Sequence, residues 1–277
     1  MQRVDPATSP TANDTTESLG LRLSRTMLRT VGDWNLIAPD DRILVAVSGG
    51  KDSYTMLDLL WRARKRSPVN YELVAYHLDQ GQPGYDGGPL RGWLEDFGAP
   101  FEIAREDTYT PVIEDARAQS GATYCRLCSR LRRGVLYSAA RRLRCNKIAL
   151  GHHRDDALET LLLNLFYSGR LQAMPAVYTT NDGAFEVVRP LIECAENTIA
   201  RYAGERDFPI LPCNLCGSQS DLKRIEVKRH LAELERSIPN VRQVMLAALR
   251  NVRPSHLLDA EVAEAWLGQA DRYPPRR

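Results

Sequence analysis

The chain has 277 residues, 43% of them hydrophobic, which is enough for one large domain and ordinary for a globular protein. A net charge of +2 singles out no acidic or basic partner, so a nucleic-acid surface would have to come from local clustering of the 37 Lys and Arg. No stretch approaches the roughly 20 apolar residues of a membrane helix, and the polar residues 1–17 predict a disordered tail and not a signal peptide. We therefore expect a cytoplasmic protein without membrane contact, in which cysteines favour metal or redox chemistry over structural disulfides.

Apolar patterns along the chain alternate between those of helices and those of strands. Helices are predicted over residues 21–31, 52–66, 89–97 and 125–144 and up to residue 166, and strands over residues 43–47, 73–78, 101–104 and 147–150. This alternation indicates an α/β fold with a doubly wound parallel sheet. Beyond residue 190 the pattern is helical except at residues 211–217, which predicts a helical C-terminal extension. We expect one domain over residues 18–250, followed by a C-terminal tail over residues 251–277.

Residues 43–53 carry the strongest signal in the chain. An apolar run typical of a strand buried on both faces is followed by two glycines and then by a helical pattern. This order forms an anion site, because glycines let the backbone approach closely and the first helix amides point outward. The pattern differs from G-x-x-x-x-G-K-[ST], since Val45 replaces its first glycine. An ordinary tight turn is the alternative interpretation. The residues predicted to bind the anion are Ala46, Ser48, Gly49, Gly50, Lys51, Asp52 and Ser53.

A second polar group follows the fourth predicted strand. Because carboxyl ends of parallel strands share one edge of a sheet, Gly151 and His152 are expected beside the anion site. Asp155 and Asp156 could hold Mg²⁺ there, or handle a proton or developing charge. Alternatively, one of them only caps the helix that follows. His77, at the end of the second strand, is a weaker candidate for nucleotide contact at this edge.

The first cysteine pair, Cys125 and Cys128, begins a predicted helix that is rich in arginine. Counting about 100° per residue places Cys128 on the inward face together with the apolar residues of this helix. Arg132 also falls on that face, where a buried guanidinium needs an anionic partner such as a phosphate or a thiolate. The opposite face is either solvated or directed towards RNA. It carries Arg130, Arg133, Arg141 and Arg144.

The second cysteine pair is Cys213 and Cys216. Two C-x-x-C pairs, on spacing alone, most often indicate a closed zinc site with four sulfur ligands. Residues 129–212 separate the pairs, which is too long for a compact zinc finger and suits a site assembled by a folded domain. Cys145 and Cys194 stand alone and are expected to be buried as small hydrophobic residues.

Taken together, the motifs resemble those of the tRNA 2-thiocytidine synthetase family. The loop matches the S-G-G-x-D-S pattern of the ATP pyrophosphatase superfamily at every defined position. Four blocks occur in the family's order, and the resemblance covers about residues 20–250. They are Ser-Gly-Gly-Lys-Asp-Ser, Cys-x-x-Cys-Ser-Arg-Leu-Arg-Arg-Gly, Gly-His-His-Arg-Asp-Asp and Pro-Cys-Asn-Leu-Cys-Gly-Ser-Gln.

The resemblance implies an adenine nucleotide alpha-hydrolase-like fold and an enzyme that replaces O2 of a tRNA cytidine, at position thirty-two of the anticodon loop, with sulfur. It also implies ATP, Mg²⁺, a sulfur-delivering cysteine desulfurase, a homodimer, and a 4Fe-4S cluster held by three cysteines, with one iron open to sulfide. Cys125 and Cys128 match two ligands, and the third is Cys213 or Cys216, with Cys216 preferred for its spacing from Arg224. Ser220-Asp221 replaces the Pro-Asn of related enzymes, which leaves that choice open. Catalytic roles are implied for Lys51, Asp52, Arg132, Asp155 and Asp156.

Two alternatives remain at this point. A synthetase of the same superfamily that delivers an amine, as lysidine synthetase does, would hold zinc in its cysteines. A non-catalytic module that binds RNA or a nucleotide would hold a structural zinc through four thiolates. The metal and the release of pyrophosphate distinguish these hypotheses.

Overall fold

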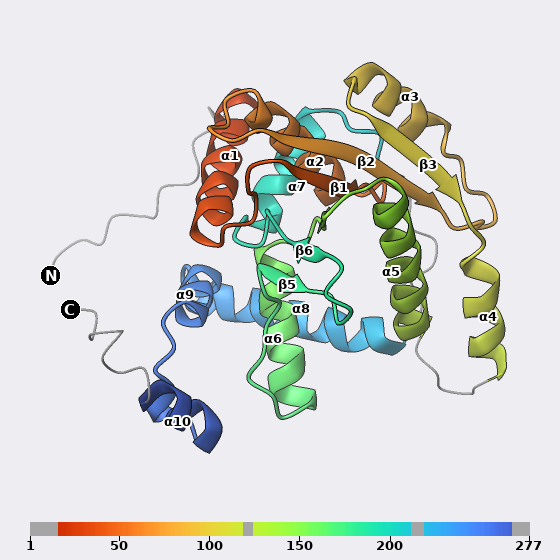
Figure 1. The fold of residues 1–277 in the computed structure, drawn as a ribbon. Coiled ribbons are helices and arrows are strands. Elements are labelled where there is room, and N and C mark those ends of the chain that lie inside the picture. Colours follow the sequence, from red (N-terminus) through yellow and green to blue (C-terminus); the bar gives the residue numbers. More distant parts are fainter. Residues whose placement is uncertain (1–15, 119–123, 212–218, 268–277) are drawn as a thin grey trace, which may run out of the picture. The chain divides into compact units, whose positions relative to one another are not determined.

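The computed structural model describes residues 16–118, 124–211 and 219–267 (Figure 1). The elements, in chain order, are α1 (Thr16–Asp33), β1 (Asp41–Ala46), α2 (Lys51–Arg64), β2 (Tyr71–Asp79), α3 (Gly88–Phe97), β3 (Phe101–Arg105), α4 (Tyr109–Ala118), α5 (Tyr124–Arg142), β4 (Lys147–Ala149), α6 (Arg154–Tyr167), β5 (Val177–Thr179), β6 (Glu186–Val188), α7 (Glu196–Glu205), α8 (Gln219–Ser237), α9 (Val241–Leu249), the 3₁₀ helix η1 (Pro254–His256) and α10 (Ala260–Leu267). Among these residues, no helix has both the length and the apolar character that crossing a bilayer requires.

The strands form one six-stranded sheet in the order β3-β2-β1-β4-β6-β5. All neighbouring strands are parallel except β5, which pairs antiparallel with β6 at the edge. The predicted α/β fold with a doubly wound, largely parallel sheet is therefore confirmed. The sequence did not predict β5 and β6, which have three residues each and display no periodicity of two; β4 is equally short, but its apolar run continues to Leu150.

Alternating residues of β1 reach separate hydrophobic cores on the two faces of the sheet. Ile43 and Val45 join the core that packs α1, α2, α3 and α7 against the sheet. Leu44 points the other way, into the core that includes Val135 and Ala139 of α5. The strand that the apolar run predicted is therefore buried on both faces of the sheet, as expected.

The order of the strands places a topological switch point between β1 and β4. From β1 the chain passes outward through β2 to β3, and then returns to the opposite side of β1 as β4. In open parallel sheets, ligands bind outside the carboxyl ends of the strands where the winding direction reverses. The loops after β1 and β4 flank that point, and both were singled out from the sequence.

The chain divides into two compact units, residues 1–229 and residues 230–277. The boundary that the sequence predicted lies near residue 250. The boundary in the structure comes after residue 229, so α9 and the last part of α8 lie in the second unit. Within that unit, the Arg242 guanidinium pairs with the Glu235 carboxylate at 2.9 Å. The expected tail over residues 251–277 contains η1 and α10, and the expected tail over residues 1–17 overlaps α1 at its last two residues. Residues 1–15 lie outside the described part of the chain.

Candidate active site at the carboxyl edge of the sheet

The turn between β1 and α2 is closed by its own serine side chains. Ser53 Oγ accepts a hydrogen bond from the Ser48 amide at 3.1 Å and donates one to the Gly50 carbonyl at 2.8 Å. Gly50 is the extended N-cap residue of α2, and the helix begins at Lys51, as predicted. Ser53 is buried, so its hydroxyl shapes the loop. The first amides of α2 remain at the helix terminus, where an anion binds.

Gly49 is the residue at which the loop requires glycine. Its φ of +85° lies in the left-handed region, and an added Cβ would stand 2.8 Å from Leu211 Cδ1. The Leu211 amide also donates to the Gly49 carbonyl at 2.9 Å. The segment after α7 therefore crosses directly over the loop, only two residues before Cys213. No local sequence pattern indicates this long-range contact between Leu211 and Gly49.

The loop after β4 lies against the first turn of α2. A Cβ on Gly151 would stand 3.2 Å from the Asp52 carbonyl carbon and 3.2 Å from the Ser53 amide nitrogen. His153 Nε2 lies 3.7 Å from Asp52 Oδ1. The expectation that these two polar groups share one edge of the sheet is confirmed by this packing. A side chain at residue 151 would crowd the backbone of the first turn of α2.

Lys51 lies between two carboxylates. Its ammonium donates to Asp52 Oδ2 at 3.1 Å and to Glu196 Oε1 at 3.3 Å. Burial alone would lower the pKa of Lys51, but these two anions raise it above its ordinary value, so the side chain is cationic at neutral pH. Asp52 Oδ1 is buried and lies 3.1 Å from the Lys51 ammonium and 3.7 Å from His153 Nε2, although it accepts no hydrogen bond from the residues that the structure describes. A further cation at this oxygen would therefore compete with Lys51.

The two adjacent aspartates of the second group hold secondary structure in place. Asp156 Oδ2 accepts the His153 amide at 3.0 Å while His153 Nδ1 accepts the Asp156 amide, which forms a capping box at the start of α6. Asp155 Oδ2 accepts the Glu196 amide at 2.8 Å, and Arg154 lies 3.2 Å from Asp155 Oδ1. The capping alternative therefore describes Asp156. Asp155 instead ties the start of α7 to α6.

A cation from α8 reaches the same carboxylates. Arg224 lies 3.7 Å from Asp156 Oδ1 and 3.8 Å from Glu159 Oε2. Burial raises the pKa of Glu159, although the Arg224 charge opposes this shift. Arg224 had entered the sequence analysis only through its spacing from Cys216, and Glu159 was not singled out as part of the site. A carboxylate on the inner face of an apolar helix, such as Glu159, is a signal that could have found it.

Two of the histidines at this edge, the buried His77 and the half-buried His152, are neutral. Burial lowers the pKa of His77, and the Arg132 charge lowers it further against the pull of the Val47 carbonyl. A carbonyl can only accept, so His77 Nδ1 donates to Val47 at 2.7 Å and Nε2 accepts from the Tyr85 hydroxyl. Burial, and then the Arg189 charge, lower the pKa of His152 to about 4. Neither histidine carries positive charge to a phosphate at neutral pH.

Helix α5 runs from the carboxyl edge of the sheet back to its amino edge. Near its start, Cys128 Sγ lies 3.8 Å from Gln80 Oε1, just after β2. Near its end, the Arg42 side chain at the start of β1 donates to the Leu143 carbonyl. The first cysteine helix thus begins at the edge that carries the loop. Cys128 is half-buried, which agrees with its predicted inward face; the side chain of Cys125, and all of residues 212–218 with Cys213 and Cys216, lie outside the described part of the chain.

The predicted inward position of Arg132 is wrong, because its side chain is exposed. Helix counting gave the correct stripe, since Val135 and Ala139, which continue it, are buried against the sheet. Arg132 lies one turn nearer the start of α5, where the sheet no longer covers that stripe. Because the Arg132 guanidinium is exposed to water, it does not require an anionic partner within the protein. The prediction that Cys145 and Cys194 are buried is confirmed, and burial raises the pKa of both thiols.

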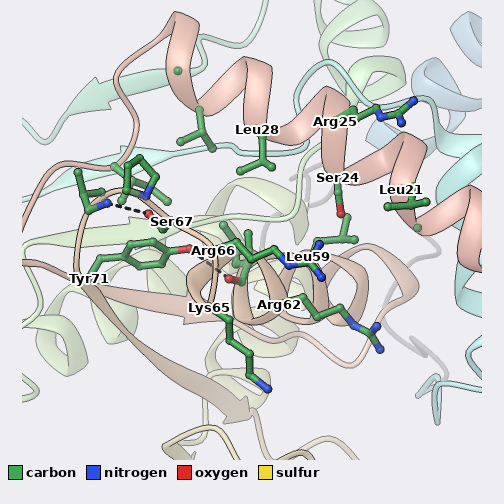
Figure 2. A pocket seen from close by; sticks show the side chains of 18 of the residues that line it. Leu21, Ser24, Arg25, Leu28, Leu59, Arg62, Lys65, Arg66, Ser67 and Tyr71 are labelled. Carbon is green, nitrogen blue, oxygen red and sulfur yellow. Dashed lines mark hydrogen bonds between the residues drawn. The ribbon is translucent and has the colours of Figure 1, made fainter.

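A cavity of about 990 Å³ lies away from this edge, between α1, α2 and the segment that follows α2 (Figure 2). Figure 2 shows side chains that line it, among them the apolar Leu21, Leu28 and Leu59 and the basic Arg62 and Arg66. No residue of the loops at 48–53 and 151–156 lines it. Loop geometry, and not this cavity, therefore locates the candidate active site. Within the described residues, no three His, Cys, Asp or Glu side chains converge as a metal site.

Comparisons with known proteins agree with the geometry of this site. A family model described as a PP-loop domain matches residues 19–210. A tRNA-cytidine(32) 2-sulfurtransferase of Sorangium cellulosum (strain So ce56) is 53% identical over 238 residues, which cover 86% of this chain and 83% of that protein. A protein with the same name from Anaeromyxobacter sp. (strain K) is 51% identical over 257 residues, or 91% of this chain and 88% of the relative.

Among solved structures, the U34-tRNA thiolase NcsA from Methanococcus maripaludis, described with its [4Fe-4S] cluster, has a similar fold. Its TM-score is 0.67 at 20% identity, and the match covers 91% of this chain and 89% of that one. At this identity the likeness concerns the fold alone. The family model and the relatives with about half of their residues identical are decisive: this chain carries a PP-loop domain and belongs to the tRNA-cytidine(32) 2-sulfurtransferase family.

Proposed function

We propose that this chain catalyses the ATP-dependent 2-thiolation of the cytidine at position 32 of tRNA. The observation that carries the proposal is the phosphate loop at the switch point, closed by Leu211 and Gly151, in a chain that is 53% identical to a named 2-sulfurtransferase. Cytosine C2 resists substitution until its oxygen becomes a leaving group. In the proposed reaction, O2 of the base attacks the α-phosphate of ATP, pyrophosphate leaves, and a sulfur nucleophile then displaces AMP from C2.

The loop residues supply the charge that adenylation requires. The amides at the start of α2 face the phosphates, and Lys51 adds a cation where negative charge develops on the departing pyrophosphate. Asp52, whose buried Oδ1 is ion-paired with Lys51 at 3.1 Å but accepts no hydrogen bond, fits a role in holding Mg²⁺ once the phosphates attract Lys51, and the bound ion would neutralise phosphate charge. Asp155 fits that role less well, because it already accepts the Glu196 amide and pairs with Arg154. Asp156 keeps its cap and lies near Arg224.

The cysteines fit an iron–sulfur cluster by their chemistry and by where their flanking residues lie. Thiolates are the ligands of such clusters, and Cys128 is a half-buried thiol at the carboxyl edge with Cys125 one turn before it on α5. Leu211, two residues before Cys213, is hydrogen-bonded to the phosphate loop. We propose Cys125, Cys128 and Cys216 as the three ligands. A 4Fe-4S cluster held by them would supply the sulfur nucleophile beside the activated base.

The remaining parts of the proposal concern partners. Three exposed arginines of α5, namely Arg130, Arg133 and Arg141, and the exposed Arg144 two residues after the helix are proposed to contact the tRNA backbone. A cysteine desulfurase is proposed as the source of sulfur, the working form as a homodimer, and the cytoplasm as its place of action. Arg132 adds positive charge near His77 at the same edge.

Anaerobic purification tests the proposal against its two zinc-containing alternatives. A brown protein with broad absorbance near ~400 nm, which releases pyrophosphate from ATP only when tRNA is present, supports it. A colourless protein that retains zinc would refute it. In that case, tRNA-dependent release of pyrophosphate would indicate an amine-delivering synthetase, and its absence would indicate a binding module.

A further inference from the structure

Glu196 joins the phosphate loop to helix α8 through one carboxylate. Its Oε1 accepts from Lys51 of the loop at 3.3 Å, and its two oxygens accept from Lys228 of α8 at 3.1 and 2.8 Å. The side chains are 24% exposed for Glu196, 27% for Lys51 and 52% for Lys228, so the bridge is partly shielded from water. No sequence motif includes Glu196 or Lys228, and the proposed reaction assigns neither a role.

The position of Glu196 is set independently of the two lysines. It is the first residue of α7, and its amide donates to the buried Asp155 carboxylate at 2.8 Å. Burial would raise the pKa of Glu196, but the hydrogen bond from Lys228 and the charges of Lys51 and Lys228 lower it below its ordinary value. The positive end of the α7 dipole acts in the same direction. Glu196 is therefore an anion that lies between two cations, Lys51 and Lys228.

A bound nucleotide competes with Glu196 for one of those cations. Lys51 is the only one of the two lysines on the phosphate loop, and phosphate oxygens at the start of α2 would attract its ammonium away from Glu196. Glu196 would then have Lys228 as its remaining lysine partner. Since α8 also carries Arg224, which faces Asp156 and Glu159, the helix is attached to the site by two cations. It begins at Gln219, three residues after Cys216.

We propose that Glu196 is a positioning residue that exchanges Lys51 for the nucleotide phosphates while it retains Lys228, and so couples nucleotide binding to α8. The identity of the nucleotide as ATP rests on the proposed function. The proposal predicts that two substitutions change the affinity for nucleotide in opposite directions. Removing the Glu196 charge leaves Lys51 with Asp52 as its remaining carboxylate partner and removes an anion beside the phosphates, so nucleotide binding strengthens. Removing Lys228 leaves Lys51 as the main partner of Glu196, so binding weakens.

The test compares Glu196→Gln, Lys228→Met and the double variant in the full-length chain. Titration calorimetry with Mg²⁺ and α,β-methylene-ATP measures the dissociation constant without turnover. We expect it to fall about two- to fivefold in Glu196→Gln and to rise by a similar factor in Lys228→Met, the range of one partly exposed ion pair. The double variant should match Glu196→Gln, because Lys228 acts through Glu196. Lys223→Met is the matched control, since Lys223 lies on the same helix over the Tyr167 ring.

A merely structural bridge would shift both single variants in the same direction, or leave both unchanged while lowering the melting temperature. Either result overturns the inference, as does an additive double variant. Binding that follows the predicted pattern without any tRNA-dependent release of pyrophosphate would refute the proposed function and leave the positioning role of Glu196 standing. A wild-type chain that binds no nucleotide would overturn both.

Discussion

Two regions at the carboxyl edge of the sheet differ in how far their charges are already paired within the chain. In the phosphate loop, Ser53 is bonded to the backbone and Lys51 lies between Asp52 and Glu196. In the first turns of α5, Arg132 is exposed and Cys128 is half-buried. The loop is thus organised before any ligand arrives, and phosphates must displace contacts that already exist. The first turns of α5 instead present an exposed cation, Arg132, and a half-buried thiol, Cys128, which lies 3.8 Å from Gln80 Oε1.

Replacing the cysteines should have the largest effect on activity, because they are the proposed ligands of a cluster that the chain itself does not contain. Replacing Cys125, Cys128 or Cys216 with alanine should abolish iron binding and thiolation after anaerobic reconstitution, whereas Cys213→Ala should retain iron. Iron per chain is the measurement. Cys194→Ala is the control, since that thiol is buried, and it should keep its iron. Loss of iron in all four variants of the two pairs would indicate a closed site and exclude an iron that is open to sulfide.

The paired charges of the loop should be nearly as important for turnover. Lys51→Ala and Asp52→Ala should fold, keep the cluster and lose ATP-dependent thiolation by about a hundredfold or more, as when one preorganised charge at a reacting centre is removed. The rate of pyrophosphate release with tRNA is the readout. Lys65→Ala, at the other end of α2, should leave that rate unchanged. Near-normal turnover in either loop variant would mean that the loop has been misinterpreted.

Gly49→Ala tests whether the loop is organised by its backbone. A non-glycine residue at φ +85° costs about 1–2 kcal/mol, and the contact with Leu211 adds overpacking of about 1–3 kcal/mol. The melting temperature should fall by about 5 °C or more, and nucleotide binding should be lost. Gly183→Ala is the matched control, because its φ is +69° with open space around the added Cβ. It should cost only the conformational part, about 1–2 kcal/mol or roughly 2–8 °C, and so clearly less than Gly49→Ala. Equal effects of both substitutions would remove the role assigned to Leu211.

The exposed arginines of α5 should show the smallest effect and the one most sensitive to salt. Neutralising Arg130 together with Arg133 should weaken tRNA binding about tenfold at low salt and reduce the dependence of log Kd on log salt by up to about 2. Filter binding at several salt concentrations measures both quantities. The control pair is Arg22 and Arg25, two exposed arginines with the same spacing on α1. A similar loss in the control pair would mean that any basic surface of the chain contributes equally.

The features that could be predicted from the sequence are those that depend on residues close together along the chain. The strand, the two glycines and the start of α2 follow from an apolar run and turn chemistry, and they appear where expected. Glu196 and Leu211 are brought to the loop across about 150 residues of chain by the order of the strands, so no local pattern could reveal them. Arg132 shows a different limit. Helix periodicity identifies a face, but it does not tell how far along the helix the sheet still covers that face.

Nucleoside analysis of tRNA treated with the purified chain tests the proposed function most directly. The reconstituted protein is incubated anaerobically with Mg²⁺, ATP, a sulfide source and tRNA from cells that lack the enzyme, and the digested tRNA is analysed by mass spectrometry. We predict 2-thiocytidine at position 32, formed only with ATP, accompanied by AMP and pyrophosphate, and absent with Lys51→Ala. Consumption of ATP that leaves cytidine 32 unmodified, or that places the new group on another nucleoside, would contradict the proposed function.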